Sequence, residues 1–181
     1  MTRQRETFSP LQRGLHWAMA VLVIAMLFIG IGMVTTLHPV YLTLVAIHKP
    51  LGIVILILVL LRLAVRLKQG KPPLPDDLPR LQHLGAHASH LLLYALLFAQ
   101  PLLGWAMLSA GGYPVVLYGP IRLPPIAPHN DALHAVLRAG HTWCAYLLFA
   151  TILLHLAAAL FHGLIRRDGV LGSMVFRRER V

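Results

Sequence analysis

The sequence predicts an all-α integral membrane protein built as a bundle of four transmembrane helices. Three observations support this fold class. Apolar residues make up 57% of the 181-residue chain and charged residues only 12%, whereas a soluble domain carries about 25% charged residues. Four long stretches are almost free of charge, and each has the ~20 residues that a membrane-spanning helix needs. The Lys and Arg residues gather before the first stretch, after the second and after the fourth.

The boundaries of the spans follow from these apolar stretches and from the turn residues between them. Ser9 and Pro10 are typical of the cap and the first residue of a helix. The proline-rich segment 69–79 is expected to form a loop, and so is the longer segment 110–131, which we expect to cover one face of the bundle. We expect a single transmembrane domain over residues 1–181, with spans at about 15–37, 43–67, 84–109 and 134–165.

The distribution of positive charge predicts the orientation. Of the 16 Lys and Arg residues, all but Lys49, Arg122 and Arg138 fall on the side of the two termini. Because positive charge accumulates on the cytoplasmic side, we expect a multi-pass protein of the bacterial inner membrane with both ends in the cytoplasm. Topology and anionic lipid explain the net charge of +10, so nucleic acid is not expected as a partner.

Histidine is the residue type that points to chemistry. The chain has eleven histidines but a single cysteine, Cys144, so an intrachain disulfide is impossible. An ionisable residue inside a membrane is a functional candidate by default, and neutral imidazole is a common ligand of metals and of haem iron. Seven histidines lie in or at the ends of the expected spans: His16, His48, His87, His90, His141, His155 and His162.

Depth along the helices sorts four of these histidines into pairs. His141 and His155 are separated by fourteen residues, which is about 21 Å along a helix and nearly the same face. Span one starts on the inner side and span two on the outer side, so His16 matches the depth of His155, and His48 that of His141. The sequence therefore predicts two bis-histidine sites between facing helices, as two stacked haems require.

Small residues one helical turn after the paired histidines support this interpretation. A porphyrin that lies against a helix needs space at that position, because residues four apart share a face. After the four paired histidines the residues are all small: Ala20, Gly52, Ala145 and Ala159. The other histidines keep two interpretations each. His87 and His90 make polar contacts near the inner end of span three, or His90 is a haem ligand; His162 is an interface anchor or a quinone-site residue.

Several segments resemble the prokaryotic cytochrome b561 family, which includes superoxide:ubiquinone oxidoreductase. The resemblance covers nearly the whole chain, and the spacing of His141 and His155 is its most specific feature. Similar pairs occur in the cytochrome b subunits of hydrogenases and formate dehydrogenases. The matching segments are Leu15–Trp17, Ile47–Gly52, Leu61–Leu67, His87–Tyr94, Gln100–Gly104 and His141–His155.

The resemblance implies a di-haem cytochrome with two haem b groups per chain. His48 and His141 would hold the periplasmic-side iron, and His16 and His155 the cytoplasmic-side iron. The implied activity is that of an oxidoreductase that transfers electrons across the membrane from a periplasmic donor, superoxide in the leading interpretation, to ubiquinone. Bis-histidine ligation leaves no open iron position, so outer-sphere electron transfer is expected.

Charged and polar residues at the two surfaces are candidates for the substrates of this reaction. On the outer side, Lys49, Arg138 and Arg122 could steer an anion toward the periplasmic haem, or they could pair with haem propionates or lipid headgroups. On the inner side, the candidate quinone contacts are Arg13, His87, His90 and His162.

Two other functions stay open at this point. The chain could be a membrane cytochrome that exchanges electrons between the quinone pool and a periplasmic redox protein, for which an ordered 110–131 loop would offer a docking face. It could also be a haem-free transporter, which would need intramembrane carboxylates or broken helices. The expected spans contain no Asp or Glu, which argues against the transporter.

Overall fold

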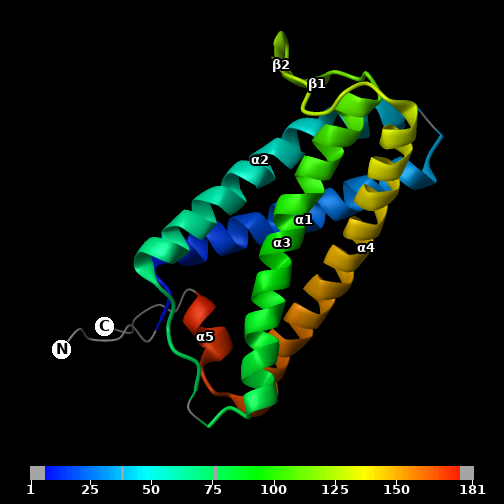
Figure 1. Cartoon of the computed structure of the whole chain (residues 1–181). Helices are drawn as coiled ribbons and strands as arrows, with labels where there is room; N and C mark the ends of the chain where they lie inside the picture. Colours follow the sequence, from blue (N-terminus) through cyan, green and yellow to red (C-terminus); the bar gives the residue numbers. More distant parts are fainter. Residues whose placement is uncertain (1–6, 38, 76, 176–181) are drawn as a thin grey trace.

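The structure is a computed structural model that describes residues 7–37, 39–75 and 77–175. Each of its four long helices is long and apolar enough to cross a membrane, the last one together with its continuation to Arg166. The predicted fold class, an all-α membrane four-helix bundle, is thereby confirmed. Each helix begins a few residues before the span expected from the sequence. The helices are α1 (Pro10–Thr35), α2 (Val40–Gln69), α3 (Arg80–Ala110) and α4 (Asp131–Leu160) (Figure 1).

Side-chain caps fix the N-terminal ends of α1 and α4. Ser9 Oγ accepts a hydrogen bond from the N–H of Gln12 at 3.2 Å, and Gln12 Oε1 accepts one from the N–H of Ser9 at 3.0 Å. The expected start at Ser9 is therefore confirmed, and Gln12 completes a capping box. Asn130 Oδ1 accepts a hydrogen bond from the N–H of Leu133 at 2.8 Å. These contacts satisfy N–H groups that have no partner inside a helix.

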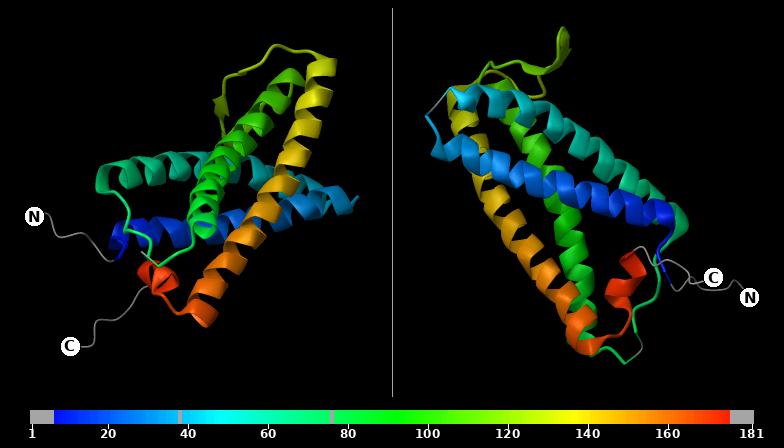
Figure 2. Two further views of the ribbon diagram at one scale, coloured as in Figure 1. Left: turned by 60° about the horizontal axis from the view of Figure 1, so that its bottom comes forward. Right: turned by 180° about the vertical axis from the view of Figure 1, so that it is seen from behind.

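The helices form two antiparallel pairs that cross each other (Figure 2). α1 packs along α2 and α3 along α4, and the two pairs meet mainly through α2 and α3. A small core of Leu96, Cys144 and Leu148 lies between α3 and α4. Large apolar side chains on the outside are exposed, for example Phe28 at 70% and Leu154 at 71%. Lipid rather than protein is the natural solvent of this outer surface.

The segment between α3 and α4 contains a small β-hairpin. β1 (Val115–Tyr118) pairs antiparallel with β2 (Ile121–Leu123) around a turn at Gly119. β1 contacts α2 and α3, but the tip of the hairpin projects beyond the ends of the helices (Figure 1). The expectation of a loop without strands was therefore wrong, because two short stretches of strand-forming residues flank a turn here. That the segment covers one face of the bundle stays a prediction.

The opposite end of the bundle joins the two ends of the described chain. α4 continues as a π-helical turn, η1 (Phe161–Arg166), and the short helix α5 (Val170–Met174) follows it. The N–H of Phe8 donates to the carbonyl of Ser173 at 3.3 Å, and Trp17 Nε1 donates to the carbonyl of Met174 at 3.0 Å. The start of α1 and α5 thus lie together (Figure 2), as an even number of spans requires. That this end faces the cytoplasm stays a prediction from charge.

Candidate functional site

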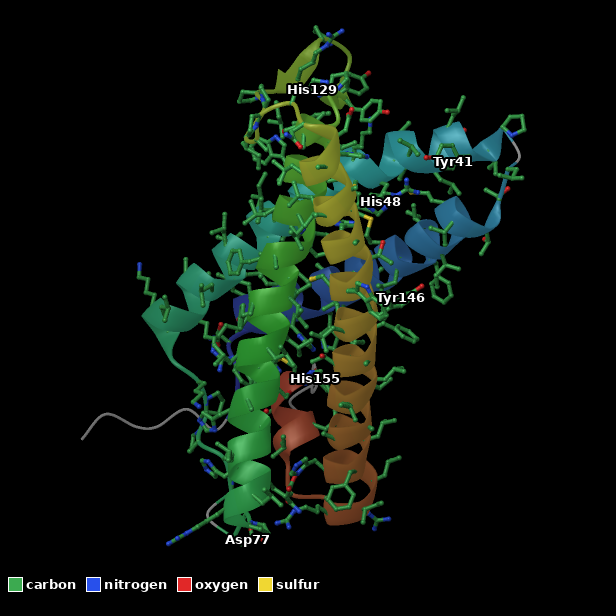
Figure 3. All side chains as sticks on the ribbon, turned by 45° about the vertical axis from the view of Figure 1, so that its right-hand side comes forward. Tyr41, His48, Asp77, His129, Tyr146 and His155 are labelled. Carbon is green, nitrogen blue, oxygen red and sulfur yellow. The ribbon has the colours of Figure 1, made fainter. Side chains whose placement is uncertain are left out.

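Two pairs of histidines lie between the crossing helix pairs. His141 of α4 faces His48 of α2, with ring centres 6.2 Å apart and ring planes at 69°. His155 of α4 faces His16 of α1, with ring centres 6.3 Å apart and ring planes at 73°. Figure 3 shows His48 beside one half of α4 and His155 further along that helix. The structure brings together the same two pairs that helix depth predicts.

Both separations fit a metal ion held between two imidazoles. A metal–imidazole bond is about 2 Å long, so two such bonds and the depth of two rings place the ring centres about 6 Å apart. Two imidazoles in direct stacking contact lie closer, as His83 and His87 do at 5.1 Å. The separations of the two interhelical pairs are therefore compatible with one metal ion held between the two imidazoles of each pair.

Two of the four imidazoles also carry a buried atom that lacks a hydrogen bond. Nδ1 of His16 and Nδ1 of His48 have no partner among the described residues. A buried unsatisfied polar atom costs about 1–3 kcal/mol, so such an atom calls for an explanation in a native structure. A group from outside the chain, bound between the facing rings, would supply one.

His141 is oriented by Gln100 of α3. Its Nδ1 donates to the backbone carbonyl of Gln100 at 3.0 Å, and this tautomer leaves the lone pair on Nε2. A carbonyl in that position is the usual means of orienting a metal-bound histidine. The side-chain Nε2 of Gln100 lies 3.2 Å from Nε2 of His141. This amide must therefore turn away before His141 Nε2 can bind a metal.

A glycine of α3 allows the close approach to the His141 ring. A Cβ added at Gly104 would lie 3.2 Å from Cε1 of His141 and 3.4 Å from Nδ1. By contrast, a Cβ at Gly52, one turn after His48, would meet only Met26 Cε, at 3.9 Å. The sequence interpretation gave no role to Gln100 or Gly104. Their four-residue spacing places them on one helix face, and this was the available signal.

A third imidazole joins the pair formed by His16 and His155. The ring centre of His90 on α3 lies 5.5 Å from that of His155. His90 Nδ1 donates to the carbonyl of Ala86, one turn earlier in the helix, at 2.7 Å. His90, one of the candidate quinone contacts, thus contacts a paired histidine directly.

The three outer basic residues do not converge on one point. Lys49 Nζ lies 3.5 Å from the carbonyl of Pro114, just before β1. Arg138 is exposed beside an open groove on the outer side of α4, lined also by Trp143 and Tyr146. Arg122 is exposed on β2, in the projecting hairpin. Only Lys49 follows directly after a paired histidine.

The other candidate quinone contacts lie at three separate places. Arg13 Nη1 donates to the carbonyl of Val175 at 3.1 Å. His87 is exposed, with Nε2 2.7 Å from Lys71 Nζ and Nδ1 2.8 Å from the carbonyl of His83. His162 lies in η1, where its Nδ1 is 2.6 Å from Asp168 Oδ2. These residues do not form one pocket.

Asp168 is the centre of a polar network beyond the end of the fourth span. Its Oδ2 accepts from His162 and, at 3.0 Å, from Arg166 Nε, and its Oδ1 accepts from the N–H of Val170 at 3.2 Å. Burial alone would raise the pKa of Asp168, but the hydrogen bonds from His162, Val170 and Arg166 outweigh it and lower the pKa below its usual range. Arg166 also pairs with Asp77 at 2.7 Å. The network fixes η1 to the start of α5.

The fold and the paired histidines together define a class of protein. A transmembrane helix bundle that places imidazoles face to face between its helices is suited to hold redox-active metal groups inside the membrane. The sequence profile of the prokaryotic cytochrome b561 family matches residues 7–177, and the chain belongs to that family.

Named relatives cover almost the entire chain. It is 33% identical over 175 residues to the "probable superoxide oxidase CybB" of Yersinia pestis, which covers 95% of this chain and 97% of the relative. It is 30% identical over 177 residues to "cytochrome b561 homolog 2" of Escherichia coli strain K12, with 96% and 94% covered. "Cytochrome b561 homolog 1" of the same strain is 29% identical over 175 residues, with 95% and 98% covered.

Family membership has direct consequences for the molecule. The protein belongs to the bacterial inner membrane and takes part in membrane electron transfer, and its family implies b-type haem. The expected family and location are therefore confirmed.

Proposed function

We propose that the chain is a di-haem b-type cytochrome that transfers electrons across the membrane from periplasmic superoxide to ubiquinone. The observation that carries the proposal is the presence of two interhelical histidine pairs, at 6.2 and 6.3 Å, at two levels of α4. His48 and His141 hold one haem b, and His16 and His155 hold the other. Each haem, when bound, supplies an iron that accepts and returns one electron.

The contribution of the chain is to place and enclose these groups. His141 and His155 are fourteen residues apart, so one helix sets the two sites about 21 Å apart along its axis. That distance covers much of a hydrocarbon core about 30 Å thick. An imidazole on each side of the iron leaves no position for dioxygen, which favours electron transfer without binding of oxygen to the metal.

Superoxide is the donor that this surface and one relative favour. Two superoxide ions give up one electron each and leave as dioxygen, while one ubiquinone takes two electrons and two protons. Lys49, Arg138 and Arg122 place positive charge at the end of the bundle where the His48–His141 pair lies, which raises the encounter rate of a small anion. The relative from Yersinia pestis is named a probable superoxide oxidase.

Ubiquinone is expected at the opposite end, with Arg13, His87, His90 and His162 as its candidate contacts. His162 is the best placed of the four to hand over a proton. Its Nδ1 lies 2.6 Å from Asp168 Oδ2, a contact that holds the ring in one orientation. A π-helical turn such as the one that carries His162 is also frequent at functional sites.

A periplasmic redox protein is the alternative donor, and the β-hairpin favours it. The hairpin is ordered and projects from the bundle, and Tyr118 and Ile121 are 83% and 57% exposed. Replacement of residues 116–122 by a short glycine linker distinguishes superoxide from a protein as the electron donor. Loss of electron uptake from a protein donor with unchanged uptake from superoxide would establish the alternative, and the reverse would exclude it.

The haem-free transporter gains no support. Among the described residues the carboxylates are Asp77, Asp131 and Asp168, and each lies at the end of a long helix or in a connecting segment. Intramembrane carboxylates, which mark many transport sites, are thus absent from the described parts of the spans.

The decisive experiment is a pyridine-haemochrome assay scored per chain on the purified protein. Two b-type haems are expected for the wild type and one for His48→Ala or His155→Ala. His83→Ala is the matched control, because His83 is exposed and outside both pairs. One haem per wild-type chain would show that one of the two histidine pairs is not a haem site. A wild type without haem would refute the proposal. Reduction of ubiquinone by superoxide in proteoliposomes is then the activity to measure.

A further inference from the structure

Two arginines of α2, Arg62 and Arg66, are half-buried near the pair formed by His16 and His155. Arg62 interacts electrostatically with both His16 and His155. Arg66, one turn later, interacts with His90. Neither arginine is fully exposed. Both arginines thus lie near the site at which α1 and α4 present their paired imidazoles.

The position of Arg62 along α2 repeats the spacing found on α4. Arg62 follows His48 by fourteen residues, as His155 follows His141. Fourteen residues fall about 40° short of four turns, so Arg62 and His48 share nearly one helix face. α2 therefore carries an arginine at the level where α4 carries its second histidine, and this arginine points to the same interhelical region.

Tyr94 of α3 holds both guanidinium groups. The Cζ atoms of Arg62 and Arg66 lie 5.9 and 5.7 Å from the centre of the Tyr94 ring, within the range of cation–π contacts. The hydroxyl group of Tyr94 is buried, and the described residues offer its O–H no acceptor, because Arg62, which interacts with it, can only donate. The cluster thus contains two cations and an unused hydroxyl donor.

No acidic side chain balances these cations in the described part of the chain. Its salt bridges involve only His162, Arg166, Asp168 and Asp77, which belong to the network at η1. A guanidinium group that is partly removed from water is costly without an anion or a hydrogen-bond acceptor. The cluster of Arg62, Arg66 and Tyr94 is therefore a site for an anion with several oxygen atoms.

We propose that Arg62 and Arg66 bind the propionate carboxylates of the haem held by His16 and His155, with the Tyr94 hydroxyl group as a further donor. This inference rests on the proposed function, because it needs a haem at that pair. Arginine is suited to carboxylate through its paired N–H groups. Phosphate of an anionic lipid has similar chemistry. However, Tyr94, which contacts both arginines, lies one turn after His90 on α3, and the ring of His90 contacts that of His155, so the cluster lies beside the cofactor site.

The test uses the purified full-length holoprotein and the variants Arg62→Gln, Arg66→Gln and their combination. Transfer of haem to excess apomyoglobin measures the rate of haem loss, and a redox titration gives the midpoint potential of each haem. Arg62→Gln should speed the loss of one haem about tenfold and lower its potential, because a hydrogen bond to a charged group is removed. The other haem should be unchanged.

Two controls separate binding from a general effect on folding. Lys68→Gln removes an exposed positive charge from the same helix end and should leave both haems unchanged. Arg62→Lys keeps the charge but loses the paired geometry, so it should restore most of the potential and only part of the retention. Tyr94→Phe keeps the ring and removes the donor, and should speed loss of the same haem by a smaller factor.

Unchanged haem loss and potentials in the double variant would overturn the inference. Unchanged haem together with loss of co-purified anionic phospholipid would assign the cluster to a lipid phosphate and would overturn it as well. If the double variant does not accumulate, Arg62→Lys and Tyr94→Phe decide by the same readouts. A wild type without haem would instead refute the proposed function, so the two failures are distinguishable.

Discussion

The ring centre of His90 lies 5.5 Å from that of His155, closer than His16, which lies 6.3 Å from the same ring. Three imidazoles thus converge, and the proposed haem would need only two of them as ligands. The separation favours His16, because two metal–nitrogen bonds and two rings span about 6 Å. We therefore assign His90 to the surroundings of the haem.

Substitution of these two histidines tests the assignment. His16→Ala should lower the haem content from two to one per chain, because an axial ligand is lost. His90→Ala should keep both haems and shift only the potential of one, because a polar neighbour is lost. Pyridine haemochrome and a redox titration measure the two effects. One haem per chain in His90→Ala and two in His16→Ala would instead make His90 the ligand and His16 the neighbour of the haem.

Gly104 tests the approach of α3 to the other pair. In Gly104→Ala the new Cβ would press on Cε1 of His141 at 3.2 Å, so we expect weaker retention of that haem and a lower melting temperature. Gly85→Ala on the same helix is the matched control, because nothing lies within 4 Å of its Cβ position. It should be neutral or stabilising by up to about 1 kcal/mol. Equal melting temperatures for Gly104→Ala and Gly85→Ala would contradict the prediction.

The outer basic residues should affect the rate with superoxide unequally. Lys49→Gln should slow electron uptake several-fold at low ionic strength, because Lys49 adjoins His48, and Arg122→Gln should have little effect, because it lies on the projecting hairpin. Added salt should reduce the difference between wild type and Lys49→Gln. Stopped-flow reduction by superoxide measures these rates, with Arg80→Gln at the opposite end as the control. Equal slowing in all three variants would argue against steering.

The Asp168 network predicts that the local stability of α5 depends on pH. A carboxyl group with a lowered pKa stabilises the fold above the usual carboxyl pKa of about 4, and the contribution is lost as the pH falls through the lowered value. Protection of α5 in hydrogen exchange, corrected for the intrinsic rate, should therefore hold from pH 7 to 5 and fall below about 4.

Two substitutions test that network at neutral pH. Asp168→Asn should lose about 1–3 kcal/mol of local stability, because three hydrogen bonds to a charged group are weakened. Asp77→Asn should change little, because the Asp77 side chain is 75% exposed and exposed ion pairs contribute little. Equal hydrogen-exchange protection of α5 in both variants would show that Asp168 does not stabilise this part of the fold.

Much of this molecule could be predicted from the sequence because membrane helices obey simple rules. Span length, charge distribution and a repeat of fourteen residues between His141 and His155 need only the geometry of one helix and the thickness of a bilayer. The Ser9 cap likewise depends on neighbours in the sequence. These features are local or follow from depth along an axis.

Other features depend on how the helices cross, and a helix-by-helix interpretation could not supply them. The contacts of His90 with His155 and of Gly104 with His141 arise from the angle at which α3 passes α4. The β-hairpin was missed because strands of four and three residues carry little signal. The convergence of Arg62 and Arg66 on Tyr94 also joins two helices, and charge counting had explained both arginines by topology alone.

The arrangement of the two helix pairs has a consequence for assembly. The bundle consists of two helical hairpins, α1 with α2 and α3 with α4, and the two helices of each pack against each other. Each histidine pair joins α4 to the other helical hairpin. The cofactors would therefore act as cross-links between two units that insert into the bilayer separately. Haem supply would then set the yield of mature protein, and a cell starved of haem would hold two loosely associated hairpins open to proteolysis.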